Sequence, residues 1–266
     1  MDGVSFRIHI AVVGFEIDRI SLAAIEMKAD KIYLITKKNT KNDPDKGLYY
    51  LEENKKILKN AGIQVEVEFI DRVHDLGLIL SSTKKIIEIE KNNHIFINIS
   101  SGSNLSAIAG TIVSMMYNND YHITPYYVKP QTYTEPNLNQ PITSGIEKIY
   151  DVLTFPAKIP DQRLIEVLNL IKSSKKVDSD GKKYVTKKDL IIHFKKYLDE
   201  LNKRFIEEKK ETPTPEQEKA KSYAWLNQNI VNKLKNEWDM IEIKNEGKYS
   251  QIRLTKKGEN MLEYLT

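Results

Sequence analysis

The sequence contains no cysteine in its 266 residues. Disulfide bonds and cysteine-ligated metal sites are therefore excluded. Histidines are few, and they show neither HExxH nor HxH spacing, so we expect no metal site. The five histidines are His9, His74, His94, His122 and His193.

Long apolar runs are also missing. The longest ones, such as IHIAVVGF, fall far below the ~18–20 residues of a membrane span. The N-terminus has no signal-peptide core or cleavage site. Hydrophobic residues make up 40% and charged residues 29%, a balance typical of a globular protein. We therefore expect no membrane partner and a cytoplasmic location.

Several familiar catalytic and cofactor motifs are absent. The chain has neither GxGxxG nor GxxxxGK[ST], so the sequence does not support a dinucleotide site or a triphosphate-binding loop. No Ser-His-Asp arrangement can be recognised from spacing. We expect no cofactor and assign no catalytic residue.

Charge is distributed unevenly along the chain. Residues 1–160 carry 18 Lys/Arg and 19 Asp/Glu, whereas residues 161–266 carry 23 Lys/Arg and 18 Asp/Glu. The excess of positive charge in the second half suggests contact with a polyanion.

The first half of the chain alternates between two patterns. Near-continuous apolar runs predict strands covered on both faces, and amphipathic segments predict helices between them. This alternation favours an α/β fold with a Rossmann-like parallel sheet. In the first helix we expect Ile17, Ile20, Leu22, Ile25 and Met27 largely to face inward. Predicted strands are 6–14, 31–36, 63–70, 94–100 and 122–129, and predicted helices are 16–29, 45–62, 75–93 and 104–118.

The second half predicts helices 159–174, 185–210 (one or two helices, with Thr186 as N-cap) and 221–239. A β-hairpin over 240–255 and a last helix over 256–266 follow, with a polar loop at 211–219. This order is typical of a winged helix-turn-helix. Pro156 and Pro160 mark the joint, so we predict domains 1–155 and 156–266.

Two loops follow strands of the predicted sheet with residues suited to ligand binding. In open parallel sheets, ligands bind beyond the carboxyl ends of the strands, where the strand order reverses. One loop holds Gly14, Phe15, Glu16, Asp18 and Arg19, and the other holds Ser100, Ser101, Gly102, Ser103 and Asn104. The second loop opens a helix, whose N-terminal amides favour anions. A plain N-cap is the alternative interpretation.

The helix from Ser222 to Asp239 is the predicted recognition helix. Trp225, Ile230, Leu234 and Trp238 form its apolar stripe, and Asn, Gln and Lys side chains on the other face suit base and phosphate contacts. The hairpin tip is the predicted wing. A solvated polar helix face is the alternative. The predicted DNA-contacting residues are Ser222, Tyr223, Asn227, Gln228, Asn232, Lys233, Lys248, Tyr249 and Arg253.

Three stretches in this order, HIAVVGFEIDRI, NISSGSNLSAIAG and PYYVKPQTYTE, ahead of a winged helix, resemble the archaeal CARF-domain (CRISPR-associated Rossmann fold) transcriptional regulators. The resemblance covers essentially the whole chain. It implies a homodimer that senses cyclic oligoadenylate through the two loops and binds double-stranded DNA through the winged helix. Many relatives carry a Gly-Gly-Thr or Gly-Gly-Met second motif followed by a basic residue, whereas this chain has Ser-Gly-Ser-Asn.

The sequence allows more than one ring size for the ligand and allows the ring to be either bound or cleaved. A two-fold dimer presents each loop twice, and aromatic faces such as Phe15, Tyr127 or Tyr133 can stack on adenines. Four phosphates suit such a site, so cyclic tetra-adenylate is favoured, with a ring of six as the alternative. A ring nuclease, which opens the ring by positioning a ribose 2′-hydroxyl, is the alternative function.

Overall fold

The computed structural model describes residues 5–40, 46–118, 120–135, 140–209, 213–245 and 250–265. The chain divides into two compact units, Met1–Ile159 and Pro160–Thr266. Among the described residues, no helix combines the length and the apolar character needed to cross a membrane.

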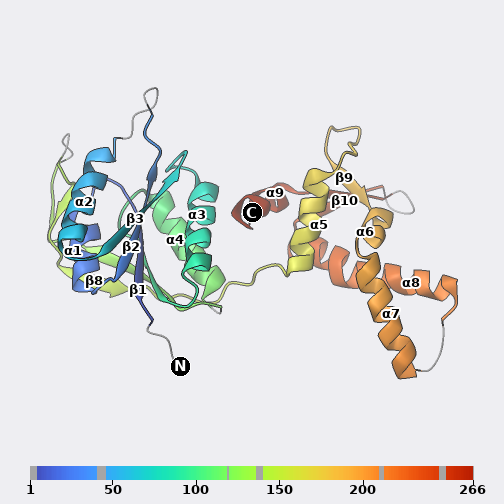
Figure 1. Cartoon of the computed structure of the whole chain (residues 1–266). Helices are drawn as coiled ribbons and strands as arrows, with labels where there is room; N and C mark the ends of the chain where they lie inside the picture. The colour runs from blue at the N-terminus through green and yellow to red at the C-terminus, as the bar shows by residue number, and fades with distance from the viewer. Residues whose placement is uncertain are drawn as a thin grey trace. The chain divides into compact units, whose positions relative to one another are not determined.

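The first unit is built on a six-stranded sheet with the order β3-β2-β1-β4-β5-β8. Neighbouring strands are parallel except β8, which pairs antiparallel to β5 at the edge. Figure 1 shows α1 and α2 on one face of this sheet and α3 and α4 on the other. The strands are β1 Arg7–Val12, β2 Lys31–Lys37, β3 Gln64–Ile70, β4 His94–Asn98, β5 Ile123–Lys129 and β8 Lys148–Asp151, with a small pair β6 Thr132–Tyr133 and β7 Thr143–Ser144.

Local signals mark three of the helix ends in this unit. Asp75 and Ser103 are side-chain N-caps of α3 and α4, and Gly62 takes a φ of +79° just beyond the end of α2. The inward face of α1 differs from the prediction. Leu22 and Ile25 are exposed, whereas the small Ala23 and Ala24 are buried, and Ala23 packs among Phe96, Tyr126 and Val128 of the sheet. The bounds are α1 Asp18–Glu26, α2 Leu48–Asn60, α3 Leu76–Ile89 and α4 Asn104–Tyr117.

The second unit packs helices around a three-stranded antiparallel sheet with the order β10-β11-β9. Thr186 caps α6 with a capping box, as predicted. Strand β9 is only three residues long, and the sequence pattern did not predict it. The elements are α5 Gln162–Ser173, β9 Tyr184–Thr186, α6 Lys187–His193, α7 Lys195–Lys209, α8 Pro215–Leu226, the π-helical turns η1 Asn227–Val231 and η2 Lys233–Glu237, β10 Ile241–Lys244, β11 Gln251–Leu254 and α9 Lys256–Leu265.

The predicted polar loop at 211–219 is corrected in its second part. Thr214 is the N-cap of α8 and Pro215 is its first residue, a position where proline loses no helical hydrogen bond. The helical stretch containing the predicted recognition helix therefore begins at Pro215 and continues through η2 to Glu237.

His9 lies fully buried on the central strand β1. Its Nδ1 lies 3.0 Å from the Tyr126 hydroxyl, and its ring stacks on Phe96. Burial, with a smaller effect of nearby Arg7 and His94, lowers the pKa of His9 to about 3. The imidazole is therefore neutral in the folded protein at neutral pH.

We expect this histidine to make the fold sensitive to acid. Below about pH 6.5, His9 binds a proton in the unfolded chain but stays neutral in the folded protein. The free energy of unfolding therefore decreases as the pH is lowered from about 6.5 to about 3. The contribution is about 1.4 kcal/mol per pH unit. Urea unfolding between pH 7 and pH 5 should show a smaller loss of stability in His9→Phe than in wild type. Equal losses in the two proteins contradict the assignment.

Candidate functional site

The two predicted ligand loops meet at the carboxyl edge of the sheet, between β1 and β4. The strand order reverses at this point, because β1 pairs with β2 on one side and with β4 on the other. A Cβ on Gly14 would lie 2.9 Å from both the Cα and the nitrogen of Gly102. The two backbones are therefore in direct contact, and no side chain fits at Gly14.

Gly102 is confined from its own side as well. Its φ is +80°, and a Cβ there would lie 2.7 Å from the Ser106 Oγ and 3.1 Å from the Val12 Cβ. Both the backbone conformation and the space therefore require glycine at this position.

A cavity of about 660 Å³ opens beside these glycines. This volume lies within the usual range of small-molecule sites. Of the predicted ligand-binding residues, Gly14, Phe15, Gly102 and Ser103 line it. The full lining is Val12, Val13, Gly14, Phe15, Lys37, Lys46, Gly47, Arg72, Val73, His74, Asp75, Gly102, Ser103, Ser106 and Ile142.

Ser103 also caps a helix, as the alternative interpretation held. Its Oγ accepts from the Ser106 amide at 3.3 Å, and the Ser106 Oγ accepts from the Ser103 amide at 3.1 Å. The capping box and the cavity wall thus share the same two serines. Cap and cavity wall are therefore compatible roles for this loop.

Other members of the second loop do not line the cavity. The amide and the hydroxyl of Ser100 both donate to the Asn98 Oδ1, and Asn98 in turn donates to the Arg19 carbonyl at 2.7 Å. The Ser101 Oγ is buried and finds no hydrogen-bond partner among the described residues. Asn104 is exposed at the first turn of α4. Asn98, which the sequence reasoning missed, ties the end of β4 to the start of α1.

Glu16 and Arg19 form a buried ion pair rather than a cavity wall. Arg19 Nη1 lies 3.0 Å from Glu16 Oε1, and Arg19 Nε donates to the Val128 carbonyl at 2.9 Å. The Thr143 hydroxyl donates to the second Glu16 oxygen. The Arg19 guanidinium lies 5.1 Å from the ring centre of Tyr127, which does not line the cavity.

This network positions the cavity wall indirectly. Asp18 accepts from the Gly145 amide at 2.7 Å, so it fixes the same 141–145 segment as Glu16. Ile142 in that segment lines the cavity and donates its amide to the Phe15 carbonyl at 3.1 Å. Glu16, Asp18 and Arg19, the three charged residues of the first motif, therefore all have partners within the protein.

Basic residues at the cavity come from loops that the sequence reasoning did not single out. Lys37 ends β2, while Arg72 and His74 follow β3. Their position directly after parallel strands is the signal that could have identified them. Among the described residues, no group of three or more acidic or histidine side chains is arranged to hold a metal ion.

In the second unit, the helical stretch from Pro215 to Glu237 has one buried and one exposed face. Leu226, Ile230, Val231 and Leu234 are in the core, with Trp225 and Trp238 packed against it. The predicted contact residues Gln228 and Asn232 are exposed. Tyr223, Asn227 and Lys233 are half-buried, and the half-buried Ser222 donates its hydroxyl to the Glu218 carbonyl at 2.9 Å.

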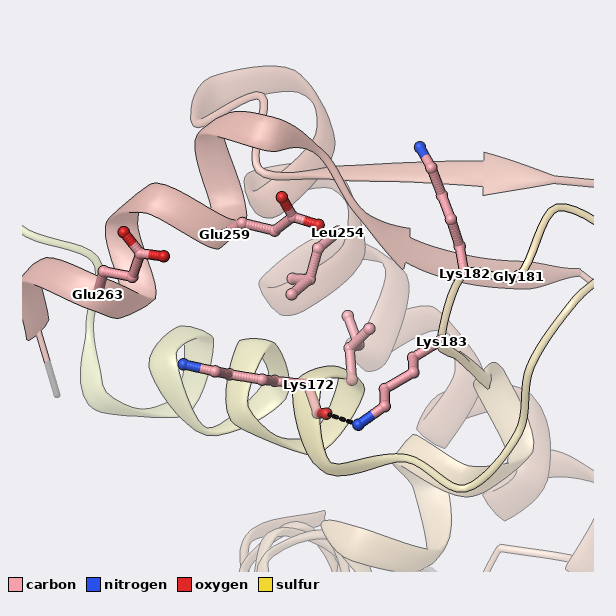
Figure 2. A pocket seen from close by; sticks show the side chains of 8 residues that line it. Lys172, Gly181, Lys182, Lys183, Leu254, Glu259 and Glu263 are labelled. Atoms are coloured by element: carbon pink, nitrogen blue, oxygen red, sulfur yellow. Dashed lines mark hydrogen bonds between the residues drawn. The ribbon is translucent and has the colours of Figure 1, made fainter.

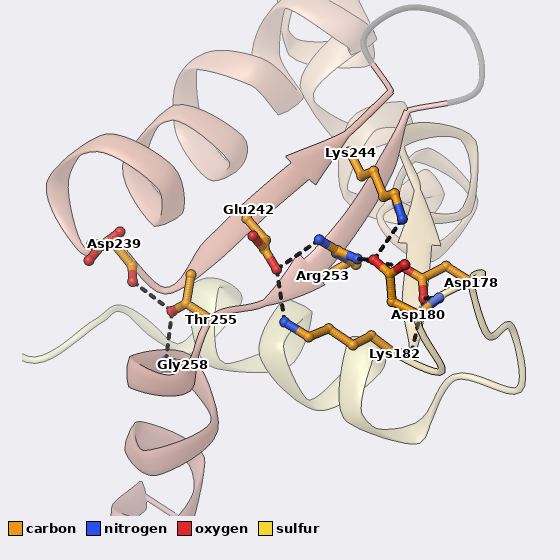
Figure 3. Close-up of polar contacts among 9 residues, drawn as sticks. All are labelled: Asp178, Asp180, Lys182, Asp239, Glu242, Lys244, Arg253, Thr255 and Gly258. Atoms are coloured by element: carbon orange, nitrogen blue, oxygen red, sulfur yellow. Dashed lines mark hydrogen bonds and ion pairs between the residues drawn. The ribbon is translucent and has the colours of Figure 1, made fainter.

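Arg253, predicted to contact DNA, is held inside the protein by three carboxylates. Figure 3 shows it between Asp178, Asp180 and Glu242, at 2.6, 2.8 and 3.0 Å. Only 8% of the residue is exposed. Hydrogen bonds from Lys244 and then Arg253 lower the pKa of Asp180 to about 2. The charge of Arg253 is thus compensated within the protein, and its contact with DNA stays a prediction.

Lys248 and Tyr249 of the predicted wing lie outside the described residues. A further cavity of about 400 Å³ lies between the end of α5, the loop before β9 and α9. Figure 2 shows lysines and glutamates around it, with Lys183 Nζ donating to the Lys172 carbonyl at 2.8 Å. Because both charge signs line it, this cavity points to no particular ligand chemistry.

Family models match both halves of the chain. Residues 7–133 match the model described as HFX_2341_N-like, N-terminal. Residues 163–266 match the DUF6293 C-terminal winged helix domain. The chain joins these two domains. The predicted fold class, a Rossmann-like parallel sheet followed by a winged helix domain, is confirmed.

Relatives and solved structures add the following likenesses. The uncharacterized protein MJ1513 of Methanocaldococcus jannaschii is 36% identical over 129 residues, which are 47% of this chain and 38% of that protein. The chain therefore spans well under half of this relative. Csm6 of Enterococcus italicus, bound to cyclic hexa-2'-fluoro-hexa-dAMP, has 16% identity and a TM-score of 0.43 over 64% of this chain and 46% of its own.

Can2 of Sulfobacillus thermosulfidooxidans, in complex with cyclic tetra-adenylate, has 10% identity and a TM-score of 0.38. That match covers 97% of this chain and 63% of Can2. Identities and scores this low say nothing about what the present chain binds.

The contact between the two glycines generates a prediction. Gly14→Ala should separate the loops, because its Cβ meets Gly102 backbone at 2.9 Å and backbone yields less readily than a side chain. We expect a loss of about 1–3 kcal/mol of stability, as for other overpacked sites, together with weaker binding of any ligand that the cavity accepts. Thermal unfolding measures the first effect, and titration with cyclic oligoadenylate as a trial ligand measures the second.

Gly62→Ala is the matched control. Gly62 has a φ of +79°, and no described atom lies within 4 Å of the place that a Cβ would take, so the change strains the backbone far from the cavity. It should lower stability without changing ligand affinity. If Gly14→Ala leaves both stability and affinity at wild-type values, the two loops are not in the contact described.

Proposed function

We propose that the chain is a DNA-binding regulator whose N-terminal domain senses cyclic oligoadenylate. The observation that carries this proposal is the cavity where the Gly14 and Gly102 loops meet, on the same chain as a winged helix domain. Open α/β sheets bind ligands at this reversal of strand order. The choice of ligand rests on the family resemblance of the two loop motifs.

The chemistry of the cavity is compatible with a phosphate-containing ring. The first backbone amides of α4 lie at the positive end of the helix dipole, which favours an anion. Phe15 is 45% exposed at the cavity and offers a face to an adenine. Cyclic tetra-adenylate remains the favoured ligand and a ring of six the alternative.

We further propose that two copies assemble through the outer face of α4. Ile108 on this helix is 48% exposed, two residues beyond Ser106, which lines the cavity. A second copy docked there would bring a second pair of loops beside the first. A ring with two-fold symmetry suits such a self-complementary arrangement.

The dimer and ligand are tested together. Wild-type protein should have twice the monomer mass in light scattering, and cyclic tetra-adenylate should raise its Tm by mass action. Ile108→Asp should give a monomer with weaker binding, because a charge replaces an apolar contact. Ile25→Asp on α1, across the sheet, is the matched control. It should change neither the mass in light scattering nor the binding of the ring.

Two results would oppose these ideas. A wild-type monomer that binds the ring with full affinity excludes the dimer requirement. A wild-type protein whose Tm responds to no ring size ends the sensor proposal. Mass spectrometry of the recovered ligand tests the ring nuclease alternative, since an opened linear product indicates cleavage and an intact ring opposes it.

The winged helix domain is proposed to bind duplex DNA through the exposed face that contains Gln228, Asn232 and Lys235. Gln228→Ala should relax preference at one base pair, at a cost of about 1–3 kcal/mol. Lys235→Ala should weaken binding to all sequences alike and reduce the salt slope by about one unit. Lys59→Ala on α2 removes the same charge elsewhere and is the control.

Electrophoretic mobility shift at several salt concentrations measures these effects. Equal affinities of Gln228→Ala and wild type for specific and scrambled sites would exclude this face from base recognition. Linkage provides a further check, since DNA and ligand must change each other's affinity by the same factor.

A further inference from the structure

One wall of the cavity carries positive charge from loops outside both predicted motifs. Lys37 lies at the end of β2, and Arg72 and His74 follow β3. Because β1, β2 and β3 are parallel neighbours, their carboxyl ends meet at one edge of the sheet. These side chains therefore reach the same cavity as Gly14 and Gly102.

The charge balance of the described cavity lining favours an anion. Three cations, Lys37, Lys46 and Arg72, line the cavity, against one carboxylate, Asp75. Asp75 accepts from the Leu78 amide at 3.1 Å as N-cap of α3, and it pairs with Arg72 Nη2 at 2.9 Å. The carboxylate is thus engaged in capping, and it orients the guanidinium.

Arg72 keeps a free edge for a ligand. Its side chain is 74% exposed although it pairs with Asp75. A guanidinium has five N–H donors in a planar fork, so one carboxylate leaves donors available for a phosphate. The second loop motif has no lysine or arginine that could supply this charge.

Apolar side chains form another part of the lining. They include Val13, Phe15 and Ile142, and the Phe15 ring lies 5.3 Å from the Tyr50 ring, which is buried. This contact restricts the Phe15 side chain while leaving it 45% exposed. A flat aromatic base can stack there, as bases do on aromatic side chains in many nucleic-acid sites.

We propose that this cavity binds one nucleotide unit, with its base on the Phe15 wall and its phosphate on Arg72, supported by Lys37. The inference rests on the proposed sensor function for the ring ligand, but it assigns the phosphate contact to the β3–α3 loop. Each protomer would then hold one unit of the ring in its own cavity. Arg72 takes the place of the basic residue that the second motif lacks.

The test is calorimetric titration of the full-length protein with cyclic tetra-adenylate, AMP and adenosine. Arg72→Ala should reduce affinity for cyclic tetra-adenylate and for AMP by about tenfold to a hundredfold, the usual effect of losing a charge-assisted hydrogen bond. Adenosine has no phosphate, so its affinity should stay unchanged. AMP binding should also depend less on salt concentration in Arg72→Ala than in wild type.

Arg163→Ala is the matched control. Arg163 is likewise a partly exposed arginine beside the N-cap aspartate of a helix, Asp161 of α5, but it lies in the other unit. It should leave all three affinities at wild-type values. Circular dichroism of Arg72→Ala should match wild type, because the side chain lies largely in solvent.

The outcomes separate this inference from the proposed function. If wild type binds the ring and Arg72→Ala binds it equally well, the phosphate assignment is overturned while the sensor proposal stands. If wild type binds AMP in an Arg72-dependent way but no ring, the sensor proposal fails and the nucleotide site stands. If wild type binds neither AMP nor any ring, both are overturned.

Discussion

The contact between the Gly14 and Gly102 backbones determines where everything else at the carboxyl edge of the sheet can lie. A Cβ at either glycine would meet atoms closer than 3.0 Å, so the β1 and β4 loops can meet only without side chains. Their contact closes the floor of the cavity between two neighbouring strands. The lining of the cavity also includes residues that follow β2 and β3, and these residues supply its positive charge.

The buried pair of Glu16 and Arg19 supports this arrangement from behind. Burying two charges costs more than their attraction returns unless further hydrogen bonds satisfy them. Here the Thr143 hydroxyl and the Val128 carbonyl provide those bonds. The pair therefore joins α1, β5 and the 141–145 segment at one point, and residues that resemble a ligand motif in sequence carry a positioning role in the structure.

The sequence patterns predicted the main elements because burial on both faces of a parallel sheet leaves near-continuous apolar runs. They also placed the two loops at the same edge, because the carboxyl ends of parallel strands lie at one edge of a sheet. That β1 and β4 are direct neighbours came from the structure. No such pattern in the sequence indicated the short strand β9 or the exposure of Leu22. The ion pair of Arg253 could not be predicted from sequence, because its partner Asp178 lies 75 residues away and an ion pair of this kind has no local signature.

The position of β1 at the centre of the sheet has a consequence for the order in which the site forms. β1 pairs on one edge with β2, which follows it early in the chain. Its other edge pairs with β4, so that Arg7 lies opposite His94, which is synthesised much later. Closing such a long loop is slow compared with local pairing. During synthesis, the floor of the cavity therefore cannot exist until the chain has emerged beyond Gly102. Until then a growing chain exposes the unpaired edge of its central strand, where chaperones and neighbouring chains can bind.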